Sequence, residues 1–357
     1  MFHRVVVKIG SSITVQEQTP QGGTWLQNMC HAIGEVQRSG CGVLVVLSGA
    51  VATGRGEGLL TVKQAQAARG QWLLNARFER AAAEEGLRCA LLLLGRQEFV
   101  HRNRYAALRE TVAALLDNGH IVVVNENDAI LPQEGSGFPD NDHLASILAI
   151  SIGAERLLLM TNVDGIFSDN PNRGGHVELL EEITNVNAPL LEIARGEHST
   201  LGRGGMVGKL KATRLATAAG IPVHIFNGVH PEYLSDIVLR GKRHGTFCPP
   251  RSRSFVTLTE RERWLLSSHN TASSIQIDAG AARALRNRKS LLAVGVHALF
   301  GRFAEREVVE IVDLQRETVA AGLTSVDSKI LEPLIKDGGN SRGIKVVHAD
   351  NLIIFTP

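Results

Sequence analysis

Short apolar runs alternate with longer stretches of helical spacing from the N-terminus to about Pro250. The apolar runs are RVVVKI, GVLVVLSG, CALLLL, HIVVVNEN, RLLLMT and IPVHIF. Continuously apolar strands separated by helices are typical of a parallel sheet that is buried on both faces. The pattern therefore predicts an α/β domain with an open, mostly parallel sheet sandwiched by helices.

The clearest predicted helix begins near Trp25. Apolar residues recur at helical spacing from Trp25 to Val36. Thr24 is suited to cap the start of this helix, and Gly40 is suited to end it.

Beyond about Ser273 the chain changes to short strand-like runs separated by turns. These runs are SIQID, LLAVGV, EVVEIVD, IKVVHA and NLIIF, and they predict a compact, β-rich second domain. Before them, residues 240–263 hold seven basic residues against two acidic ones, and Pro249 and Pro250 interrupt regular structure. We therefore expect a main domain over 1–255, a linker over 256–272 and a smaller β-rich domain over 273–357.

Composition and charge narrow the function classes only slightly. The 357 residues are 44% hydrophobic and 21% charged, as in a globular enzyme. The formal net charge of +2 does not point to a polyanionic partner. The four cysteines lie far apart and form no C-x-x-C pair, so neither a zinc knuckle nor a disulfide scaffold is indicated.

The apolar runs are too short for a signal peptide or a membrane helix. A membrane helix needs about 20 apolar residues, and the run before Lys8 holds only the valines 5–7. We therefore expect a cytoplasmic protein without a membrane partner.

Polar or glycine-rich segments follow four of the predicted strands. In open parallel sheets, ligands bind outside the carboxyl ends of the strands. The segments to consider are therefore 8–12, 48–50, 125–128 and 161–164.

The first of these segments holds Lys8, Gly10 and Ser11. A glycine after a strand lets backbone N–H groups approach a phosphate, and a nearby ammonium group neutralises its charge. Taken alone, Lys8 is explained equally well as a strand-end lysine that extends to water beside an ordinary turn.

A second glycine-rich segment, GRGGMVGK, ends in Lys209. A helix is predicted to begin near this lysine and to end at Gly220 and Pro222, and the N–H groups at a helix start bind anions. The segment is not a Walker A loop, because its glycine spacing differs and Leu210 stands where Ser or Thr would coordinate magnesium.

Two lysines on glycine-rich turns of one sheet suit phosphoryl transfer between two anions. Positioning and charge neutralisation supply most of the catalysis in such reactions. A carboxylate acceptor needs no general base, which agrees with the lack of a convincing catalytic histidine. The sequence predicts no metal site built by the protein itself.

The segments NENDA and DND hold the other candidate ligands. The amide N–H groups of Asn125 and Asn141 are suited to bind a carboxylate, and Asp128 is suited to pair with an ammonium group. Together they would recognise a free amino acid. The alternative is that these residues only cap loops, where Asn and Asp are favoured in any case.

The ordered motifs VVVKIGSS, LSGAVATGR, VVNENDA, DND, LLLMTNVDGIF and GRGGMVGK, followed by a small β domain, resemble the glutamate 5-kinases. These enzymes have the amino acid kinase fold and a C-terminal PUA domain. The resemblance spans nearly the whole chain. Single motifs would also suit aspartokinase, acetylglutamate kinase or uridylate kinase.

The resemblance implies ATP-dependent phosphorylation of the side-chain carboxylate of L-glutamate, the first step of proline biosynthesis. It assigns catalysis to Lys8, Lys209 and Asp142, with Asp142 orienting the lysines. The implied glutamate contacts are Ser48, Gly49, Ala50, Asn125, Asp128 and Asn141. The implied nucleotide contacts are Lys8, Gly10, Ser11, Thr161, Asn162, Arg203, Gly204, Gly205, Met206, Val207, Gly208 and Lys209.

The resemblance also implies that magnesium arrives with the ATP phosphates, that proline inhibits the enzyme and that the chain forms a homo-oligomer, a dimer or a tetramer. Three positions depart from the family pattern. Asn162 replaces an aspartate, Arg203 stands near a usual threonine, and Arg306 replaces a glycine of the PUA pattern. The first two bear on nucleotide affinity.

Two alternatives stay open at this point. One is a sibling kinase that acts on acetylglutamate or aspartate. The other is an RNA-binding regulator with a vestigial kinase domain, although residues 273–357 hold eleven basic residues against ten acidic ones, a weak footprint for an RNA partner.

Overall fold

The computed structural model describes residues 4–14, 24–55, 62–131, 137–169, 177–194, 205–250, 258–268, 270–336 and 343–355. The chain divides into two compact units, Met1–Val256 and Thr257–Pro357, and each unit is considered by itself. The finer limits expected from the sequence, 1–255, 256–272 and 273–357, stay a prediction.

The first unit is built on a seven-stranded sheet. Its strands are β1 (Arg4–Ile9), β2 (Gly42–Leu47), β3 (Arg88–Leu94), β4 (His120–Glu126), β5 (Arg156–Thr161), β6 (Val223–Asn227) and β7 (Thr246–Cys248). They lie in the order β3-β4-β2-β1-β5-β6-β7, and all neighbours are parallel except β6 and β7. The predicted mostly parallel sheet is confirmed, and β7 is an addition that the sequence did not reveal.

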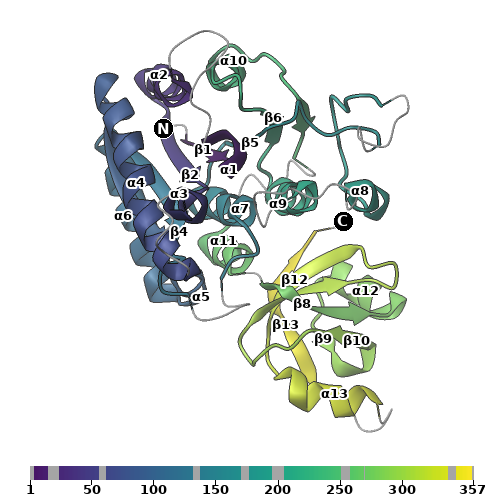
Figure 1. Cartoon of the computed structure of the whole chain (residues 1–357). Helices are drawn as coiled ribbons and strands as arrows, with labels where there is room; N and C mark the ends of the chain where they lie inside the picture. Colours follow the sequence, from purple (N-terminus) through teal and green to yellow (C-terminus); the bar gives the residue numbers. More distant parts are fainter. Residues whose placement is uncertain are drawn as a thin grey trace. The chain divides into compact units, whose positions relative to one another are not determined.

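Helices cover both faces of this sheet (Figure 1). They are α1 (Ser11–Thr14), α2 (Trp25–Arg38), α3 (Ala50–Arg55), α4 (Lys63–Glu84), α5 (Gln97–Val100), α6 (Arg102–Asp117), α7 (Asn141–Ile152), α8 (Ala188–Ala194), α9 (Met206–Ala218) and α10 (Glu232–Leu239). Helices α2, α4 and α10 pack over one face, and α6, α7 and α9 pack over the other. Among the described residues, none of the helices is both long and apolar enough to cross a bilayer.

The strands are apolar on both sides because both sides are covered. Val5, Val7 and Ile9 of β1 belong to one buried cluster with side chains of α2, α4 and α10. Val6, between them, is equally buried. Removing both faces from water supplies the main driving force for this layered fold.

Helix α2 begins as its sequence predicts. The Thr24 hydroxyl accepts a hydrogen bond from the Gln27 N–H at 3.2 Å, and the Gln27 side chain accepts one from the Thr24 N–H at 3.1 Å. This reciprocal cap satisfies two N–H groups that a helix start leaves unpaired. Gly40 follows the helix with φ +89, the left-handed region that favours glycine.

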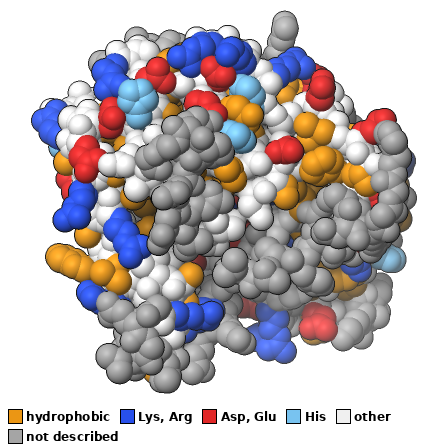
Figure 2. All heavy atoms as spheres, turned by 45° about the horizontal axis from the view of Figure 1, so that its top comes forward, with side chains coloured by type: hydrophobic (Ala, Val, Ile, Leu, Met, Phe, Trp, Pro, Cys, Tyr) orange, Lys and Arg blue, Asp and Glu red, His pale blue; other side chains and the backbone are white. Residues whose placement is uncertain are grey.

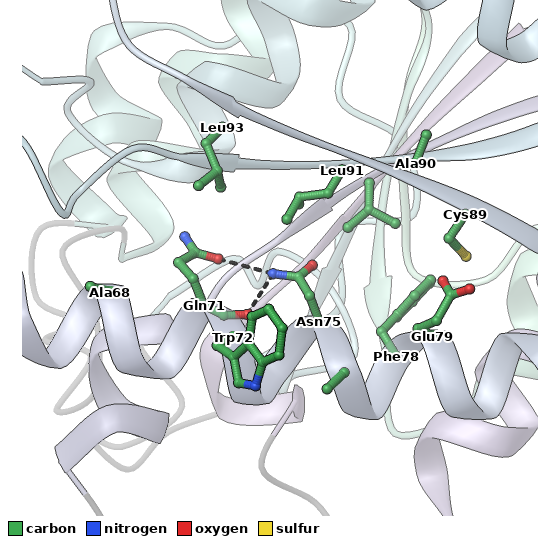
Figure 3. Close-up of a pocket in the computed structure, with 12 residues that line it drawn as sticks. Ala68, Gln71, Trp72, Asn75, Phe78, Glu79, Cys89, Ala90, Leu91 and Leu93 are labelled. Carbon is green, nitrogen blue, oxygen red and sulfur yellow. Dashed lines mark hydrogen bonds between the residues drawn. The ribbon is translucent and has the colours of Figure 1, made fainter.

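At the edge of the sheet, α4 and β3 line a cavity of about 450 Å³ (Figure 3). Its apolar wall includes Trp72, Leu91 and Leu93, which are all exposed. Gln71 and Asn75 form part of its polar wall.

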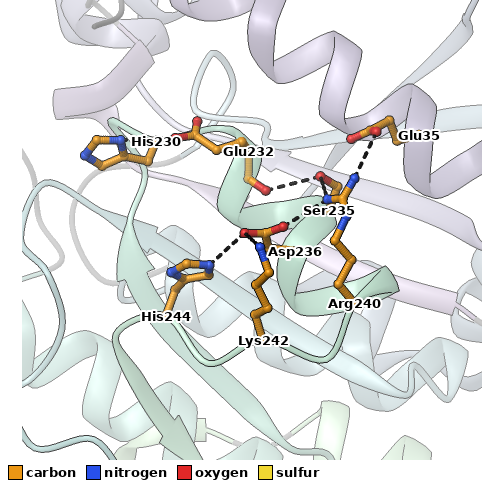
Figure 4. A network of polar contacts seen from close by, with 8 residues as sticks. All are labelled: Glu35, His230, Glu232, Ser235, Asp236, Arg240, Lys242 and His244. Carbon is orange, nitrogen blue, oxygen red and sulfur yellow. Dashed lines mark hydrogen bonds and ion pairs between the residues drawn. The ribbon is translucent and has the colours of Figure 1, made fainter. Parts of the chain in front are cut away.

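A polar network fixes the end of α10 (Figure 4). The Asp236 carboxylate accepts from Arg240 at 2.9 Å, from Lys242 at 3.1 Å and from His244 at 3.0 Å. Arg240 also reaches Glu35 of α2 at 3.4 Å. The network therefore ties α10 both to α2 and to the turn that precedes β7.

Charged side chains of both signs are interspersed on the face of the molecule shown in Figure 2. This matches the nearly equal totals of 38 basic and 36 acidic residues. A face of mixed sign does not generate the one-sign field that steers polyanions.

The second unit holds a six-stranded sheet. Its strands are β8 (Asn270–Ile277), β9 (Leu291–Leu292), β10 (Val296–Phe300), β11 (Val308–Val312), β12 (Thr318–Thr324) and β13 (Lys345–Ile354), in the order β10-β8-β11-β12-β13-β9. The other elements are α11 (Glu260–Ser267), α12 (Ala279–Arg286), the 3₁₀ helix η3 (Ala293–Gly295) and α13 (Ser328–Lys336). The predicted β-rich second domain is confirmed.

Three details of the second unit differ from expectation. The run LLAVGV, predicted as one strand, is divided between β9, η3 and the first residue of β10. The runs IKVVHA and NLIIF, predicted as separate strands, form the single strand β13, which pairs with β12 through a register shift. The segment predicted as a linker contains α11, a helix with a capping box at Thr259 and Glu262. It contacts β12 and β13, so α11 packs on the sheet of the second unit.

Arg306, at a position where the PUA pattern has a glycine, adopts a left-handed backbone conformation. Its φ is +64, in the left-handed region that costs a residue with a Cβ about 1 kcal/mol or more. Its N–H donates to the Thr324 carbonyl at 2.8 Å, and the Thr324 N–H donates to the Glu307 carbonyl at 2.9 Å. These two bonds hold the strained residue in place.

The burial of His224 predicts that the stability of the protein depends on pH. It is buried on β6 against the Phe247 ring, with centroids 4.8 Å apart. Burial, with smaller effects of Arg156 and Arg243, lowers the pKa of His224 from 6.5 to about 4. Below pH 6.5 His224 therefore binds a proton in the unfolded chain but not in the folded one. The free energy of unfolding falls by roughly 2–4 kcal/mol as the pH drops towards 4.

The variant His224→Gln has no such proton to bind. Urea unfolding between about pH 7.5 and 4.5 should show a shallower loss of the free energy of unfolding in the variant than in the wild type. Parallel pH profiles for the two proteins would contradict the assignment.

Candidate active site

Two lysines and one aspartate meet at the carboxyl edge of the first sheet. The Lys8 Nζ lies 2.9 Å from Asp142 Oδ1, and the Lys209 Nζ lies 3.1 Å from Asp142 Oδ2. Lys8 belongs to β1, Asp142 to the first turn of α7, and Lys209 to the first turn of α9. All three are buried, with exposed fractions of 5%, 0% and 6%, so the strand-end explanation of Lys8 is wrong.

The electrostatics of this cluster favour an anion. Burial lowers the pKa of the Lys8 ammonium, and Asp142 opposes that shift. Burial alone would raise the pKa of the Asp142 carboxyl, but Lys209 and Lys8 lower it overall. One ionised carboxylate thus faces two buried ammonium groups, and an incoming phosphate would balance the remaining charge.

Gly208 explains how Lys209 reaches Asp142. A Cβ on Gly208 would lie 2.1 Å from Asp140 Oδ2, so a side chain here would force the Asp140 carboxylate or the start of α9 to shift. Asp140 caps α7 by accepting from the His143 N–H at 2.8 Å. Burial, followed by the charge of Asp142, raises the pKa of Asp140.

A second group of predicted residues meets beside this cluster. The Asn141 Nδ2 donates to the Leu47 carbonyl, the Ser48 hydroxyl and Asn125 Oδ1, each at 3.0 Å. The N–H groups of Asn141 are thus bonded within the protein, and their predicted contact with a substrate carboxylate stays a prediction. The Asn125 Nδ2 likewise donates to Gln71 Oε1 at 3.2 Å.

The segment after β2 is held in a constrained turn. Gly49 has φ +109, and a Cβ there would lie 2.8 Å from the Thr14 hydroxyl. That hydroxyl donates to the Ser48 carbonyl at 3.1 Å. Ala50 then begins α3, which packs so tightly on α4 that a Cβ on Gly70 would lie 1.7 Å from the Ala50 carbonyl oxygen.

The other predicted residues are spread along the same edge. Asp128 is half-buried in the turn that follows β4. Thr161 is buried at the end of β5, where its carbonyl accepts from the Gly228 N–H at 2.7 Å, and Asn162 beside it is exposed. Gly10 and Ser11 follow β1, and Gly205, Met206 and Val207 lie at the start of α9. Arg203 and Gly204 lie outside the described residues.

Two residues of the site were not singled out from the sequence. Asp140 was visible as the first letter of DND, and its position before an apolar helix marks it as a cap. Gln71 had no local signal, because it lies within the long helix α4 and reaches the site only through the fold.

Comparisons with known proteins identify the family of this chain. The profile of the amino acid kinase family matches residues 3–227, and that of the PUA domain matches residues 273–347. Glutamate 5-kinase of Dehalococcoides mccartyi (strain CBDB1) is 33% identical over 99% of this chain and 99% of that protein. The chain belongs to the glutamate 5-kinases of the amino acid kinase family.

Further glutamate 5-kinases are similarly related. That of Vibrio vulnificus (strain YJ016) is 34% identical over 98% of this chain and 96% of its own length. That of Moorella thermoacetica (strain ATCC 39073 / JCM 9320) is 36% identical over 99% and 96%. Among solved structures, an isopentenyl phosphate kinase is 19% identical, with a TM-score of 0.49 over 69% of this chain and 100% of that one, which adds nothing to the family assignment.

Removing the shared charge should destabilise the protein strongly. In Asp142→Asn, two buried ammonium groups lose their counter-charge, and breaking a buried ion pair on one side typically costs 3–5 kcal/mol. Urea unfolding should show a loss of about 3 kcal/mol or more, part of which added phosphate or ATP restores by occupying the site.

Asp140→Asn is the matched control, because asparagine keeps the cap of α7 and Asp140 makes no ion pair that the structure records with either lysine. We expect a loss below about 1 kcal/mol for this control. Equal losses in the two variants would show that the ion pairs are not what stabilises this edge.

Proposed function

We propose that this protein transfers the γ-phosphoryl group of ATP to the side-chain carboxylate of L-glutamate, giving ADP and L-glutamyl 5-phosphate. The membership in the glutamate 5-kinases supports the reaction. The observation that supports the chemistry most directly is the pair of buried lysines held by Asp142.

In this reaction a carboxylate oxygen of glutamate attacks the γ-phosphorus, and the bond to the oxygen bridging the β and γ phosphates breaks. No proton has to move, because the nucleophile is already ionised. The barrier comes from charge, since two anions must approach each other. Lys8 and Lys209 would neutralise the phosphoryl oxygens, and Asp142 would hold both ammonium groups in place.

The glutamate site would lie beside this cluster. Its proposed members lie at the end of β4 or in the segment after it, in the segment after β2, or at the start of α7. They are Ser48, Gly49, Ala50, Asn125, Asp128 and Asn141. Asp128 would pair with the substrate ammonium group, as its acidic side chain at this edge allows.

The nucleotide would occupy the side of β1 and α9. Its proposed contacts are Lys8, Gly10, Ser11, Thr161, Asn162, Arg203, Gly204, Gly205, Met206, Val207, Gly208 and Lys209. The N–H groups at the start of α9 suit its phosphates. Magnesium would come with the ATP phosphates and lower their negative charge; the protein residues would orient the nucleotide and exclude water.

The resemblance to glutamate 5-kinases extends the proposal to the cell. We expect a cytoplasmic enzyme of proline biosynthesis that works as a homo-oligomer and is inhibited by proline. A sibling acid kinase or an RNA-binding regulator is not favoured, because relatives named glutamate 5-kinase match the chain over its full length.

The decisive assay is ADP release from MgATP with L-glutamate, run beside aspartate, acetylglutamate and UMP. The proposed function requires release with L-glutamate well above the other three acceptors. Release with none of them would refute it.

The two lysines should each be needed for turnover. We expect Lys8→Ala and Lys209→Ala to lower kcat at least about tenfold, which corresponds to about 1.4 kcal/mol of barrier. Lys211→Ala provides the control, because Lys211 is an exposed lysine on the same helix. A near-normal rate in either buried-lysine variant would refute the two-lysine mechanism.

Asp128 should govern affinity for the amino acid alone. In Asp128→Asn the ammonium group loses a charged partner, so the KM for glutamate should rise about tenfold or more while the KM for ATP stays within about twofold. Asp117→Asn, at an exposed ion pair with Arg4, should change neither. An unchanged glutamate KM in Asp128→Asn would remove the proposed role.

A further inference from the structure

A chain of side-chain amides runs from the glutamate site into helix α4. The Asn141 Nδ2 donates to Asn125 Oδ1 at 3.0 Å, and the Asn125 Nδ2 donates to Gln71 Oε1 at 3.2 Å. The Gln71 Nε2 then donates to the Glu126 carbonyl at 3.2 Å. Gln71 and Asn125 are buried, with exposed fractions of 5% and 2%.

Backbone groups fix the direction of every bond in this chain. The Glu126 carbonyl can only accept, so the amide nitrogen of Gln71 must face it and the Gln71 oxygen must face Asn125. The Glu126 N–H can only donate, and it bonds to Asn125 Oδ1 at 2.8 Å. The Leu47 carbonyl fixes Asn141 in the same way. Neither Asn can turn its amide over without pairing like with like.

The direction of these hydrogen bonds determines which side-chain atom of Asn141 is available to a ligand. Its nitrogen is saturated by three acceptors, whereas no described residue donates to its Oδ1. A half-buried amide oxygen at this edge is a hydrogen-bond acceptor, suited to an ammonium group and unsuited to a carboxylate.

Asn75, in the wall of the edge cavity, holds Gln71 in place. The Asn75 Nδ2 donates to the Gln71 carbonyl at 2.7 Å and to Gln71 Oε1 at 3.2 Å. Figure 3 shows the two side chains directed at each other in the wall of the cavity, beside the exposed Trp72. The cavity wall and the glutamate site therefore share one hydrogen-bonded network.

We propose that Gln71 is a positioning residue for the substrate. It fixes the amide of Asn125, which fixes that of Asn141, so that Asn141 Oδ1 is presented to the ammonium group of the amino acid. Asn75 supports Gln71 from the cavity. This inference rests on the proposed glutamate kinase function and adds to it a reason for preferring a free amino acid over an N-acylated one.

The variant Gln71→Glu tests the direction of these hydrogen bonds, because the ionisation of the new carboxyl group depends on pH. A neutral glutamic acid at this position reproduces both bonds, since its carbonyl accepts from Asn125 and its O–H donates to the Glu126 carbonyl. The ionised form cannot donate and repels that carbonyl. A buried carboxylic acid ionises well above its usual pH, so the defect should appear as the pH rises from about 6 to about 8.5.

The expected readout is the KM for L-glutamate, taken as the ratio of variant to wild type at each pH. We expect a ratio of about one at the acid end and about ten at the alkaline end, with the KM for ATP within about twofold throughout. A purely structural defect would affect both substrates and would not be reversed by acid.

Two further variants complete the experiment. Gln66→Glu places the same charge on the same helix at another buried glutamine, which accepts from Arg55 at 3.2 Å instead of from the site amides; its glutamate KM should not change with pH relative to the wild type. Asn75→Ala, at a half-buried position, removes only the outer support and should raise the glutamate KM about two- to threefold.

The outcomes separate this inference from the function on which it rests. An active wild type with a pH-independent, near-unity ratio in Gln71→Glu overturns the role of Gln71 alone. If Gln71→Glu does not fold, an unchanged glutamate KM in Asn75→Ala overturns it. A wild type that neither phosphorylates L-glutamate nor is stabilised by it against heat overturns both.

Discussion

One carboxylate, that of Asp142, is shared by two buried ammonium groups, and the geometry of the active edge depends on it. Moving a charge out of water costs several kcal/mol unless a partner is supplied. Lys8 lies on the central strand and Lys209 on a helix much later in the sequence. The Nζ of each lies within 3.1 Å of an Asp142 carboxylate oxygen. The first turns of α7 and α9 are thereby fixed relative to β1, and the remaining positive charge is left for phosphate.

The first turn of α7 joins two kinds of interaction that differ in physical character. Asp142 acts through charge, which attracts from many directions. Asn141, its neighbour in sequence, acts through hydrogen bonds whose donor and acceptor ends are fixed by backbone groups of Leu47 and Glu126. In the proposed reaction, the first would act on the phosphoryl group and the second on the zwitterionic amino acid. Adjacent residues on one helix can therefore coordinate the two substrates.

Much of this arrangement was predictable because the relevant signals are local. Six apolar runs correspond to six strands. Lys8, Asn125 and Thr161 were predicted from the carboxyl ends of these strands and Ser48 from the residue after one, because parallel strands end at one edge of the sheet. Lys209 was recognisable from the glycines before it. For Gly208 the structure supplies a reason, because a side chain there would collide with the Asp140 carboxylate. In the second unit, by contrast, β13 was divided in the prediction because its polar centre, His348 to Asn351, has the composition of a turn.

The direction of the amide chain lay beyond reach of the sequence for a different reason. The asparagine side chain carries a donor and an acceptor of nearly equal size, so the residue type alone does not show which of the two contacts a ligand. The orientation of the amides is fixed by groups distant in the sequence: the carbonyl of Leu47, the N–H of Glu126 and the side chain of Gln71. In the proposed role Asn141 offers its oxygen to an ammonium group and not its N–H groups to a carboxylate, because its surroundings already bind the N–H groups. On this proposal, substrate preference at this edge depends on the packed fold, including Gln71 of α4, and not on the motif alone.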